Sequence, residues 1–163
     1  MVTIFIVLSL CITQCRDARV SKGDDAPDFN AQNVDGEQVK LSDYRGKIVL
    51  VHFWASCCTD FTSAFPQLER TYRKLHSNDF ELLAVNCGEP VNLVKFAAHF
   101  HGISFPLLMD EHWEIAKLYT IPSIPINFII SKDGKIIDKV LGWPSEEYLR
   151  NIIGRLDSGR SDQ

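Results

Sequence analysis

Continuous apolar runs mark the centre of the sheet that this sequence predicts. The run from Lys47 to Trp54 is almost entirely β-branched and aromatic, which is typical of a strand buried on both faces. Phe80 to Val85 has the same character and predicts a second buried strand. Three further strands are expected at Phe105 to Met109, Ile126 to Ile130 and Lys135 to Leu141.

Apolar residues at helical spacing predict four helices that alternate with these strands. The clearest example is Phe61 to Leu75, where one apolar face recurs every three or four residues. In the last helix Ser145 is expected as the N-cap, with acidic residues in the first turn. The four helices are expected at Phe61 to Leu75, Val91 to Phe100, Glu111 to Tyr119 and Ser145 to Leu156.

An alternating segment precedes the first buried strand. Phe29 to Leu41 alternates around Asp35-Gly36, which predicts a β-hairpin. Together the elements predict an α/β fold with a mixed central sheet, helices on both faces and an N-terminal β-hairpin extension. We expect this domain to span residues 21–157, with residues 158–163 as a flexible tail.

The N-terminus has a different pattern. Val2 to Ile12 is an apolar run of about the length of a signal-peptide core, and charged residues from Arg16 onwards follow it. Residues 1–20 are therefore interpreted as a signal peptide or membrane anchor, which places the domain in an extracytoplasmic, periplasmic or membrane-anchored location. Lipidation at Cys15 is a less favoured alternative, because Gln14 stands where a small residue is expected.

Composition and charge narrow the class of partner. The 163 residues carry a formal net charge of −4 and contain no basic run, so no nucleic-acid footprint is present. We expect the partners to be exported protein thiols or disulfides, with an external reductant, and the chain to be a monomer. Contact with a membrane is expected only through the N-terminal segment.

Three of the five cysteines fall within the predicted domain, namely Cys57, Cys58 and Cys87. Cys58 lies between a buried strand and a helix, where unpaired backbone amides and the helix dipole favour an anion. Such an environment stabilises the thiolate, which is the reactive form of cysteine. Asp60 opposes this effect, so we expect moderate activation of Cys58. The alternative is a buried, inert cysteine.

The segment Phe53-Trp54-Ala55-Ser56-Cys57-Cys58, followed by a helix, resembles the TlpA/ResA-like branch of the thioredoxin superfamily, with its AhpC/TSA or redoxin-type domain. The resemblance covers roughly Ser21 to Leu156. It implies a thioredoxin fold and thiol–disulfide exchange with exported proteins. It rests also on Gly23 to Phe29, Leu41-Ser42-Asp43, Gly46-Lys47, Phe65-Pro66, Ala84-Val85-Asn86 and Tyr119 to Phe128.

The active-site motif departs from the family pattern. By the resemblance, Cys58 occupies the position of the attacking cysteine, but Phe61 replaces the resolving cysteine and Ala64 replaces a glutamate. A monothiol mechanism through Cys58 is therefore our preferred hypothesis. Cys57, Cys87 or an external thiol could then release the mixed disulfide, and these three alternatives stay open.

The resemblance also implies a substrate groove. Pro125 matches the family's cis-proline, and the backbone of the preceding residue, Ile124, is expected to pair with an extended substrate. Trp54 is a third candidate for this binding site, although packing beneath the site is the favoured interpretation.

Two other functions were considered. A redox-inactive binding or chaperone-like module would use the same cis-proline groove without turnover, and the loss of chemistry at Phe61 and Ala64 favours it. A thiol peroxidase is a weaker alternative, because Ala55 stands where that chemistry needs a hydroxyl. Histidine spacing does not converge on a metal site, so neither a metal nor a cofactor is predicted.

Overall fold

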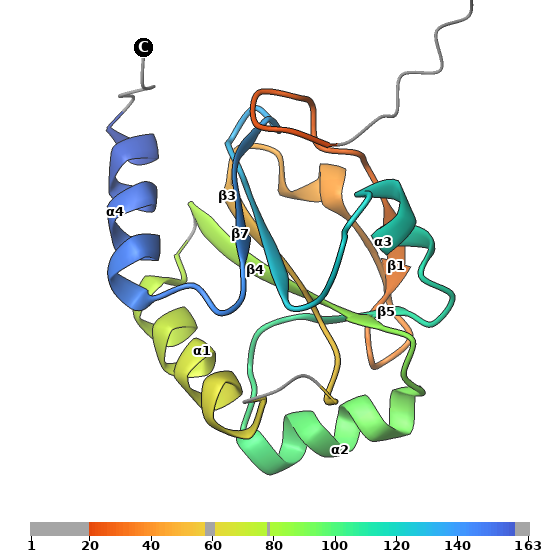
Figure 1. Cartoon of the computed structure of the whole chain (residues 1–163). Coiled ribbons are helices and arrows are strands. Elements are labelled where there is room, and N and C mark those ends of the chain that lie inside the picture. The colour runs from red at the N-terminus through yellow and green to blue at the C-terminus, as the bar shows by residue number, and fades with distance from the viewer. Residues whose placement is uncertain (1–19, 58–60, 78, 159–163) are drawn as a thin grey trace, which may run out of the picture.

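The computed structural model of this chain describes residues 20–57, 61–77 and 79–158. The predicted signal or anchor segment and Cys58 lie outside these ranges. The strands are β1 (Asn30–Gln32), β2 (Gln38–Lys40), β3 (Ile48–Trp54), β4 (Phe80–Cys87), β5 (Leu107–Asp110), β6 (Ile126–Ile130) and β7 (Ile136–Leu141). The helices are a short 3₁₀ helix η1 (Leu41–Tyr44), α1 (Phe61–Leu75), α2 (Val91–His101), α3 (Glu114–Leu118) and α4 (Glu146–Asp157) (Figure 1).

The central sheet has five strands in the order β5-β4-β3-β6-β7. β4 is parallel to β3 and β5 is parallel to β4, whereas β6 is antiparallel to β3 and β7 is antiparallel to β6. Because β3 and β4 run parallel, Cys87 at the end of β4 lies at the same edge of the sheet as the end of β3. The mixed sheet, the N-terminal hairpin and the thioredoxin topology that the sequence predicts are confirmed.

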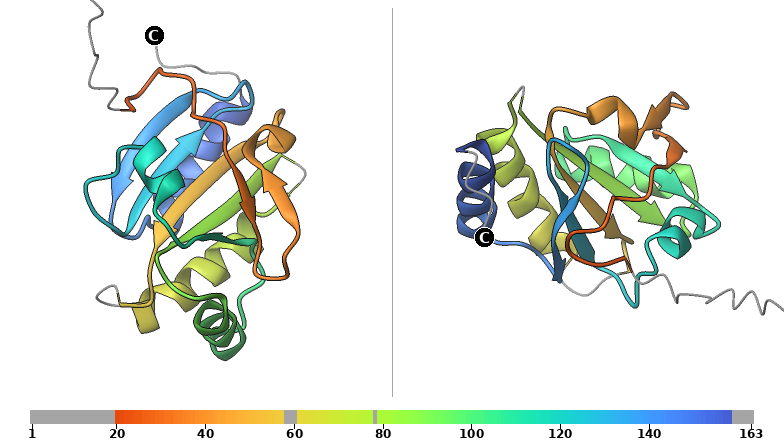
Figure 2. Two further views of the ribbon diagram at one scale, coloured as in Figure 1. Left: turned by 90° about the vertical axis from the view of Figure 1, so that its right-hand side faces the viewer. Right: turned by 90° about the horizontal axis from the view of Figure 1, so that it is seen from above.

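Two apolar clusters, one on each face of the sheet, form the core. α1, α2 and α4 cover one face, with Phe65, Val94 and Leu149 among the buried residues. The hairpin, η1 and α3 cover the other face, with Ala31 and Ile115 among the buried residues. The view from above in Figure 2 shows these two layers on opposite sides of the sheet.

The central position of β3, with both faces covered, explains why its sequence is continuously apolar. All seven of its residues are buried. Val49, Val51 and Phe53 pack into the cluster beneath α3 and the hairpin, while Leu50 and Trp54 pack into the cluster beneath α1. Because successive side chains of a strand point to opposite faces, a central strand covered on both sides needs apolar residues throughout.

α2 buries only part of its apolar surface. Only Val94 and Ala97 are buried in it. Phe96 and Phe100 are 67% and 70% exposed, and their rings stack with centroids 6.1 Å apart. The helix was predicted correctly, but its apolar residues occupy two faces and only one of them contacts the sheet.

The third helix is shorter than the predicted range Glu111 to Tyr119. Trp113 has φ 60°, in the left-handed region, so regular helix begins only at Glu114. The buried carboxylate of Asp110 accepts hydrogen bonds from the backbone amides of Ile115 (3.2 Å) and Ala116 (2.8 Å). That side chain therefore stabilises the delayed helix start, as an acidic residue at a helix N-terminus generally does.

The residues before β3 lie along both outer strands of the sheet. On one side, the amide of Gly23 donates to the carbonyl of Ile136 (2.8 Å) at the start of β7. On the other side, the amide of Val34 donates to the carbonyl of Leu107 (3.0 Å) in β5. The lead-in segment, residues 20–29, and the hairpin are thus integral parts of the domain.

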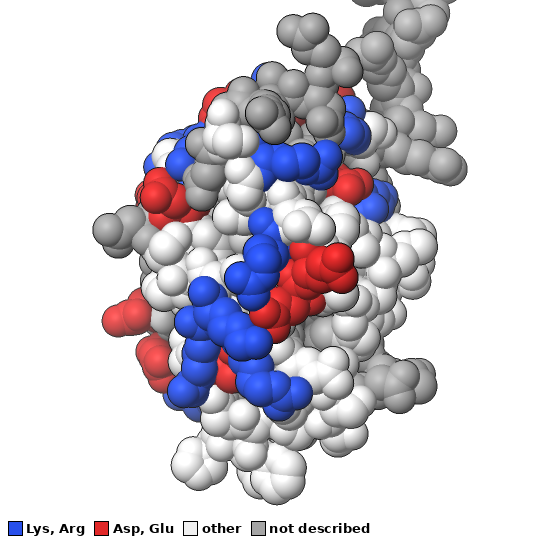
Figure 3. Space-filling view, turned by 90° about the vertical axis from the view of Figure 1, so that its left-hand side faces the viewer, with Lys and Arg blue, Asp and Glu red and all other residues white. Residues whose placement is uncertain are grey.

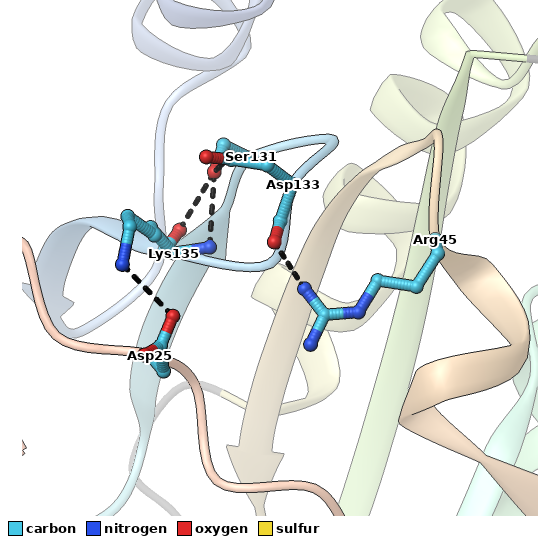
Figure 4. Close-up of polar contacts among 5 residues, drawn as sticks. All are labelled: Asp25, Arg45, Ser131, Asp133 and Lys135. Carbon is cyan, nitrogen blue, oxygen red and sulfur yellow. Dashed lines mark hydrogen bonds and ion pairs between the residues drawn. The ribbon is translucent and has the colours of Figure 1, made fainter.

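Charged side chains connect the segments before β3 to the turn between β6 and β7 (Figure 4). Lys135 Nζ contacts Asp25 Oδ1 at 2.9 Å, and the guanidinium of Arg45 donates to the carbonyl of Asp133. Gly134 has φ +86°, and a Cβ there would overlap the Arg45 guanidinium. This turn therefore favours glycine for its conformation, whereas the flexible Arg45 side chain can move aside.

The face formed by α1 and α4 carries basic and acidic side chains side by side (Figure 3). Lys74 of α1 and Arg150 of α4 both contact the carboxylate of Glu146. The Lys74–Glu146 pair links the two helices, whereas the Arg150–Glu146 pair lies within α4. Exposed pairs of this kind contribute little to stability individually. Within the described ranges, none of the helices combines the length and the apolar character needed to cross a membrane.

Candidate active site

The carboxyl ends of β3 and β4 lie in the region where the sequence predicts the reactive cysteines. Trp54, the last residue of β3, is paired in register with Asn86 of β4. Trp54 is fully buried and its ring lies 4.5 Å from that of Phe65, so it supports the site from beneath. Cys57 follows and is exposed, whereas Cys58 lies outside the described residues.

The predicted cis-proline lies beside the same end of β3. The Ile124–Pro125 peptide bond is cis, which confirms that expectation. Because Phe53 of β3 pairs with Ile126 in antiparallel register, the preceding residue, Pro125, is level with the end of β3. The structure therefore brings the Ile124–Pro125 segment and the strand end that leads to the cysteines to one edge of the sheet.

Cys87 is at this edge but faces the other side of the sheet. It ends β4, is only 2% exposed and packs in the cluster that contains Ile115 and Tyr119. Its Sγ lies 3.9 Å from the carbonyl oxygen of Val85. α1 covers the opposite face. A resolving role for Cys87 would therefore need a local opening of this cluster.

A buried polar network secures the cis-proline segment from within the sheet. His52 Nδ1 lies 2.7 Å from Asn127 Oδ1, and both side chains are fully buried. The Asn127 amide donates to the carbonyls of Val140 (3.1 Å) and Gly142 (2.7 Å). The amide of Gly142 in turn donates to the carbonyl of Pro125 (2.9 Å). Since Asn127 uses its nitrogen as a donor elsewhere, its oxygen is the acceptor and His52 Nδ1 carries the proton.

Burial lowers the pKa of His52 to about 4, although its hydrogen bond to Asn127 acts in the opposite direction. The imidazole is consequently neutral at physiological pH. Within the described residues, no group of three or more His, Cys, Asp or Glu side chains is arranged to hold a metal ion.

Sequence reasoning missed one cluster at this edge. The carboxylate of Glu89 accepts a hydrogen bond from the backbone amide of Ser56 (2.8 Å) and another from the Ser56 hydroxyl. It also accepts one from the side-chain amide of Asn86 (2.6 Å). The segment Gly88-Glu89-Pro90 after a buried strand was the available signal, but nothing in it indicates a partner 33 residues earlier.

The turn that carries Glu89 is held by Gly88 and Trp113. Gly88 has φ +79°, and a Cβ there would lie 2.5 Å from Trp113 Nε1. We expect Gly88→Ala to destabilise the protein by about 2–3 kcal/mol, because backbone strain and a steric clash add together. Urea unfolding at neutral pH measures this change.

Gly142→Ala is the matched control, because Gly142 has the same φ of +79° and no atom lies within 4 Å of a Cβ built there. It carries only the conformational cost, which we expect to be about 1 kcal/mol. Equal losses for the two variants would show that Trp113 does not restrict this turn.

A cavity of ≈ 370 Å³ opens between α1 and the segment that joins β7 to α4. Ala64, Trp143 and Pro144 are among its lining residues. Ala64 occupies the position at which the family resemblance placed a glutamate. The first turn of α1 therefore supplies this cavity with a methyl group in place of a carboxylate.

Comparison with known proteins identifies relatives with this fold. Residues 22–139 match the AhpC/TSA family. The thiol-disulfide oxidoreductase ResA of Geobacillus thermodenitrificans strain NG80-2 is 34% identical over 135 residues, which make up 82% of this chain and 77% of the relative.

Solved structures agree with this result. A Chlorobium tepidum protein assigned as a thiol:disulfide interchange protein DsbE superposes with a TM-score of 0.76 and 29% identity, over 84% of this chain and 99% of that one. The exposed lipoprotein thioredoxin Etrx1 of Streptococcus pneumoniae strain TIGR4 has a TM-score of 0.66 and 28% identity, over 80% of this chain and 100% of that one.

Proposed function

The chain belongs to the AhpC/TSA family and is a thiol–disulfide oxidoreductase of the ResA and DsbE type, and we propose that it attacks disulfides through one thiol, that of Cys58. The observation that carries this proposal is the course of the chain. β3 ends at Trp54 beside the cis Pro125, α1 begins at Phe61, and Cys58 lies between them in sequence.

Helix N-termini supply the electrostatic support for this assignment. The first amides of a helix have no partner within the helix, and its dipole adds partial positive charge at that end. A thiol within a few residues of such a terminus ionises more readily than a free cysteine. The proposal therefore assigns Cys58 to the attacking thiolate, in agreement with its position in the family motif.

The exchange conserves electrons in two steps. The Cys58 thiolate attacks one sulfur of a substrate disulfide, forms a mixed disulfide and expels the other sulfur as a thiolate, which takes up a proton from solvent. A second thiolate then attacks the substrate sulfur of the mixed disulfide, forms a new disulfide with it and expels Cys58 Sγ as a thiolate, which restores the starting state. Phe61 cannot supply this second thiolate because it has no sulfur.

We propose that an external thiol, either a small molecule or a second cysteine of the partner, performs the second step. Cys57 is exposed, but a disulfide between neighbouring residues closes a strained ring. Cys87 is buried on the face away from α1. An external thiol needs neither a strained ring with Cys57 nor the exposure of Cys87. It also suits a site in which Ala64 offers no internal proton acceptor.

The substrate is proposed to bind along the Ile124–Pro125 segment as an extended polypeptide. Backbone pairing beside the end of β3 would hold the disulfide next to the attacking sulfur, and the position of Pro125 level with that end supports this geometry. The partners are then exported proteins with thiols or disulfides. An extracytoplasmic location is proposed from the apolar N-terminal run, and the pneumococcal relative is an exposed lipoprotein.

Alkylation kinetics test the assignment of Cys58. We expect the rate of iodoacetamide modification to rise with a thiol pKa well below the free value of about 8.5, and Cys58→Ser to remove this phase. Cys57→Ser is the matched control, since it changes the adjacent sulfur and should retain the phase.

Curves that coincide for the native protein and Cys58→Ser would overturn the monothiol proposal. They would favour the redox-inactive binding module, which uses the same proline segment without turnover. Mass spectrometry of the mixed disulfide formed by Cys58 would identify the partner sulfur directly.

A further inference from the structure

The Glu89 carboxylate joins two loops at the active-site edge of the sheet. One loop follows β3 and contains Ser56 and the exposed Cys57. The other follows β4 and contains Glu89 itself. Three hydrogen bonds converge on this one side chain, two from Ser56 and one from Asn86.

The residues on either side of Glu89 are fixed in the fold. Asn86 is fully buried and is paired in register with Trp54. The amide of Gly88 donates to the carbonyl of Asp110 (3.1 Å), which holds the Glu89 turn against β5. Pro90 then begins the capping turn of α2. Glu89 therefore presents its carboxylate from a rigid part of the fold.

The contact with Ser56 has a specific geometric effect. Ser56 binds the carboxylate through both its backbone amide and its hydroxyl, so its side chain and its main chain are fixed together. Hydrogen bonds to an ionised acceptor are about twice as strong as neutral ones. The direction in which the chain leaves Ser56 towards Cys57 is consequently set by Glu89.

We propose that Glu89 is a positioning residue for the thiol chemistry: its carboxylate holds Ser56 and thereby sets the direction in which the chain runs from Ser56 into Cys57, the residue before Cys58 in sequence. This inference rests on the proposed function for its consequence in catalysis. The hydrogen-bonded connection itself does not depend on that function. It can therefore be tested separately.

Three variants show whether the hydrogen bonds of Glu89 or its negative charge matter for the thiol reaction. Glu89→Ala removes all the bonds. Glu89→Gln retains them, because its amide oxygen can accept from Ser56 and Asn86 while its NH₂ group donates to the Ser56 hydroxyl. Ser56→Ala removes one bond from the opposite side, and it tests the same connection if Glu89→Ala does not fold.

The first measurement is the rate at which the full chain reacts with 5,5′-dithiobis(2-nitrobenzoate), taken as the phase that Cys58→Ser removes. We expect Glu89→Ala to slow this phase by about tenfold, Ser56→Ala by about threefold and Glu89→Gln by less than about twofold. A merely structural role would lower the stability of Glu89→Ala but would leave the rate of this phase in the folded protein unchanged. An unchanged rate in Glu89→Ala, or a rate in Glu89→Gln as low as in Glu89→Ala, would overturn the proposal.

The second measurement is hydrogen exchange at the Ser56 amide, which needs no thiol reactivity. Protection in the native protein and in Glu89→Gln, lost in Glu89→Ala, supports the connection. Equal exchange in all three proteins overturns it. If Cys58→Ser removes no reactive phase, the proposed function fails, and the exchange result still decides whether Glu89 holds Ser56.

Discussion

Replacing Phe65 by alanine is expected to destabilise the protein by about 3–5 kcal/mol, the range found when a buried aromatic residue is truncated. Phe65 is fully buried at the start of α1. Its ring centroid lies 4.5 Å from that of Trp54 and 5.4 Å from that of Phe105. The side chain thus joins α1 to β3 and to the segment before β5, and its removal leaves a cavity that rigid neighbours cannot fill.

Urea unfolding at neutral pH under reducing conditions measures this loss. Phe96→Ala is the matched control, because it makes the same chemical change on α2 at a side chain that is 67% exposed. We expect the control to lose less than about 1 kcal/mol. Similar losses in the two variants would mean that Phe65 does not carry the packing of α1 on the sheet.

The second large effect is the pH dependence of stability that His52 causes. Its pKa is lowered from 6.5 to about 4 by burial, so the unfolded chain binds a proton more readily than the folded one between these values. Stability must therefore fall as the pH falls from about 6.5 towards 4. We expect His52 to contribute a loss of about 2 kcal/mol between pH 7 and pH 5.

His52→Asn isolates this contribution. An Asn side chain keeps a donor for Asn127 but does not titrate, so the fall in stability over this range should shrink by about 2 kcal/mol. His112→Asn is the control, because His112 is exposed, and its profile should follow that of the native protein. Profiles that are identical for His52→Asn and the native protein would show that the buried imidazole is not excluded from protonation.

The structure gives a physical reason for the low affinity of His52 for a second proton. In the part of the chain that is described, His52 Nε2 has no hydrogen-bond partner, and the ring lies 4.8 Å from that of Trp143. A proton added there would place a positive charge in apolar packing without an acceptor.

The elements that sequence reasoning located best are those whose pattern follows from burial alone. The bounds of α1 and β6 agree with the predicted ranges, because both pack a continuous apolar surface against the core. The cap of α4 was also predictable, and the Ser145 hydroxyl accepts from the amide of Tyr148 at 3.1 Å. In these cases the determining residues are neighbours along the chain.

The features that were missed depend on residues far apart in sequence. The spacing of Phe96 and Phe100 does not reveal which face of α2 meets the sheet, because only the tertiary structure decides that. The left-handed conformation of Trp113 places its ring against Gly88, 25 residues earlier, and the local sequence does not indicate this contact. The bond between Glu89 and Ser56 likewise exists only once β3 and β4 lie side by side.

The course of the chain before β3 has a consequence for solubility. Exposed outer strands present unpaired backbone amides and carbonyls, which can pair with strands of other molecules and lead to aggregation. Here Gly23 pairs with Ile136 at the start of β7 and Val34 pairs with Leu107 in β5, so a single stretch of about twenty residues covers part of each outer strand. A shortened protein that began at β3 would expose the unpaired backbone groups that this stretch now covers, so residues 20–40 are expected to limit self-association.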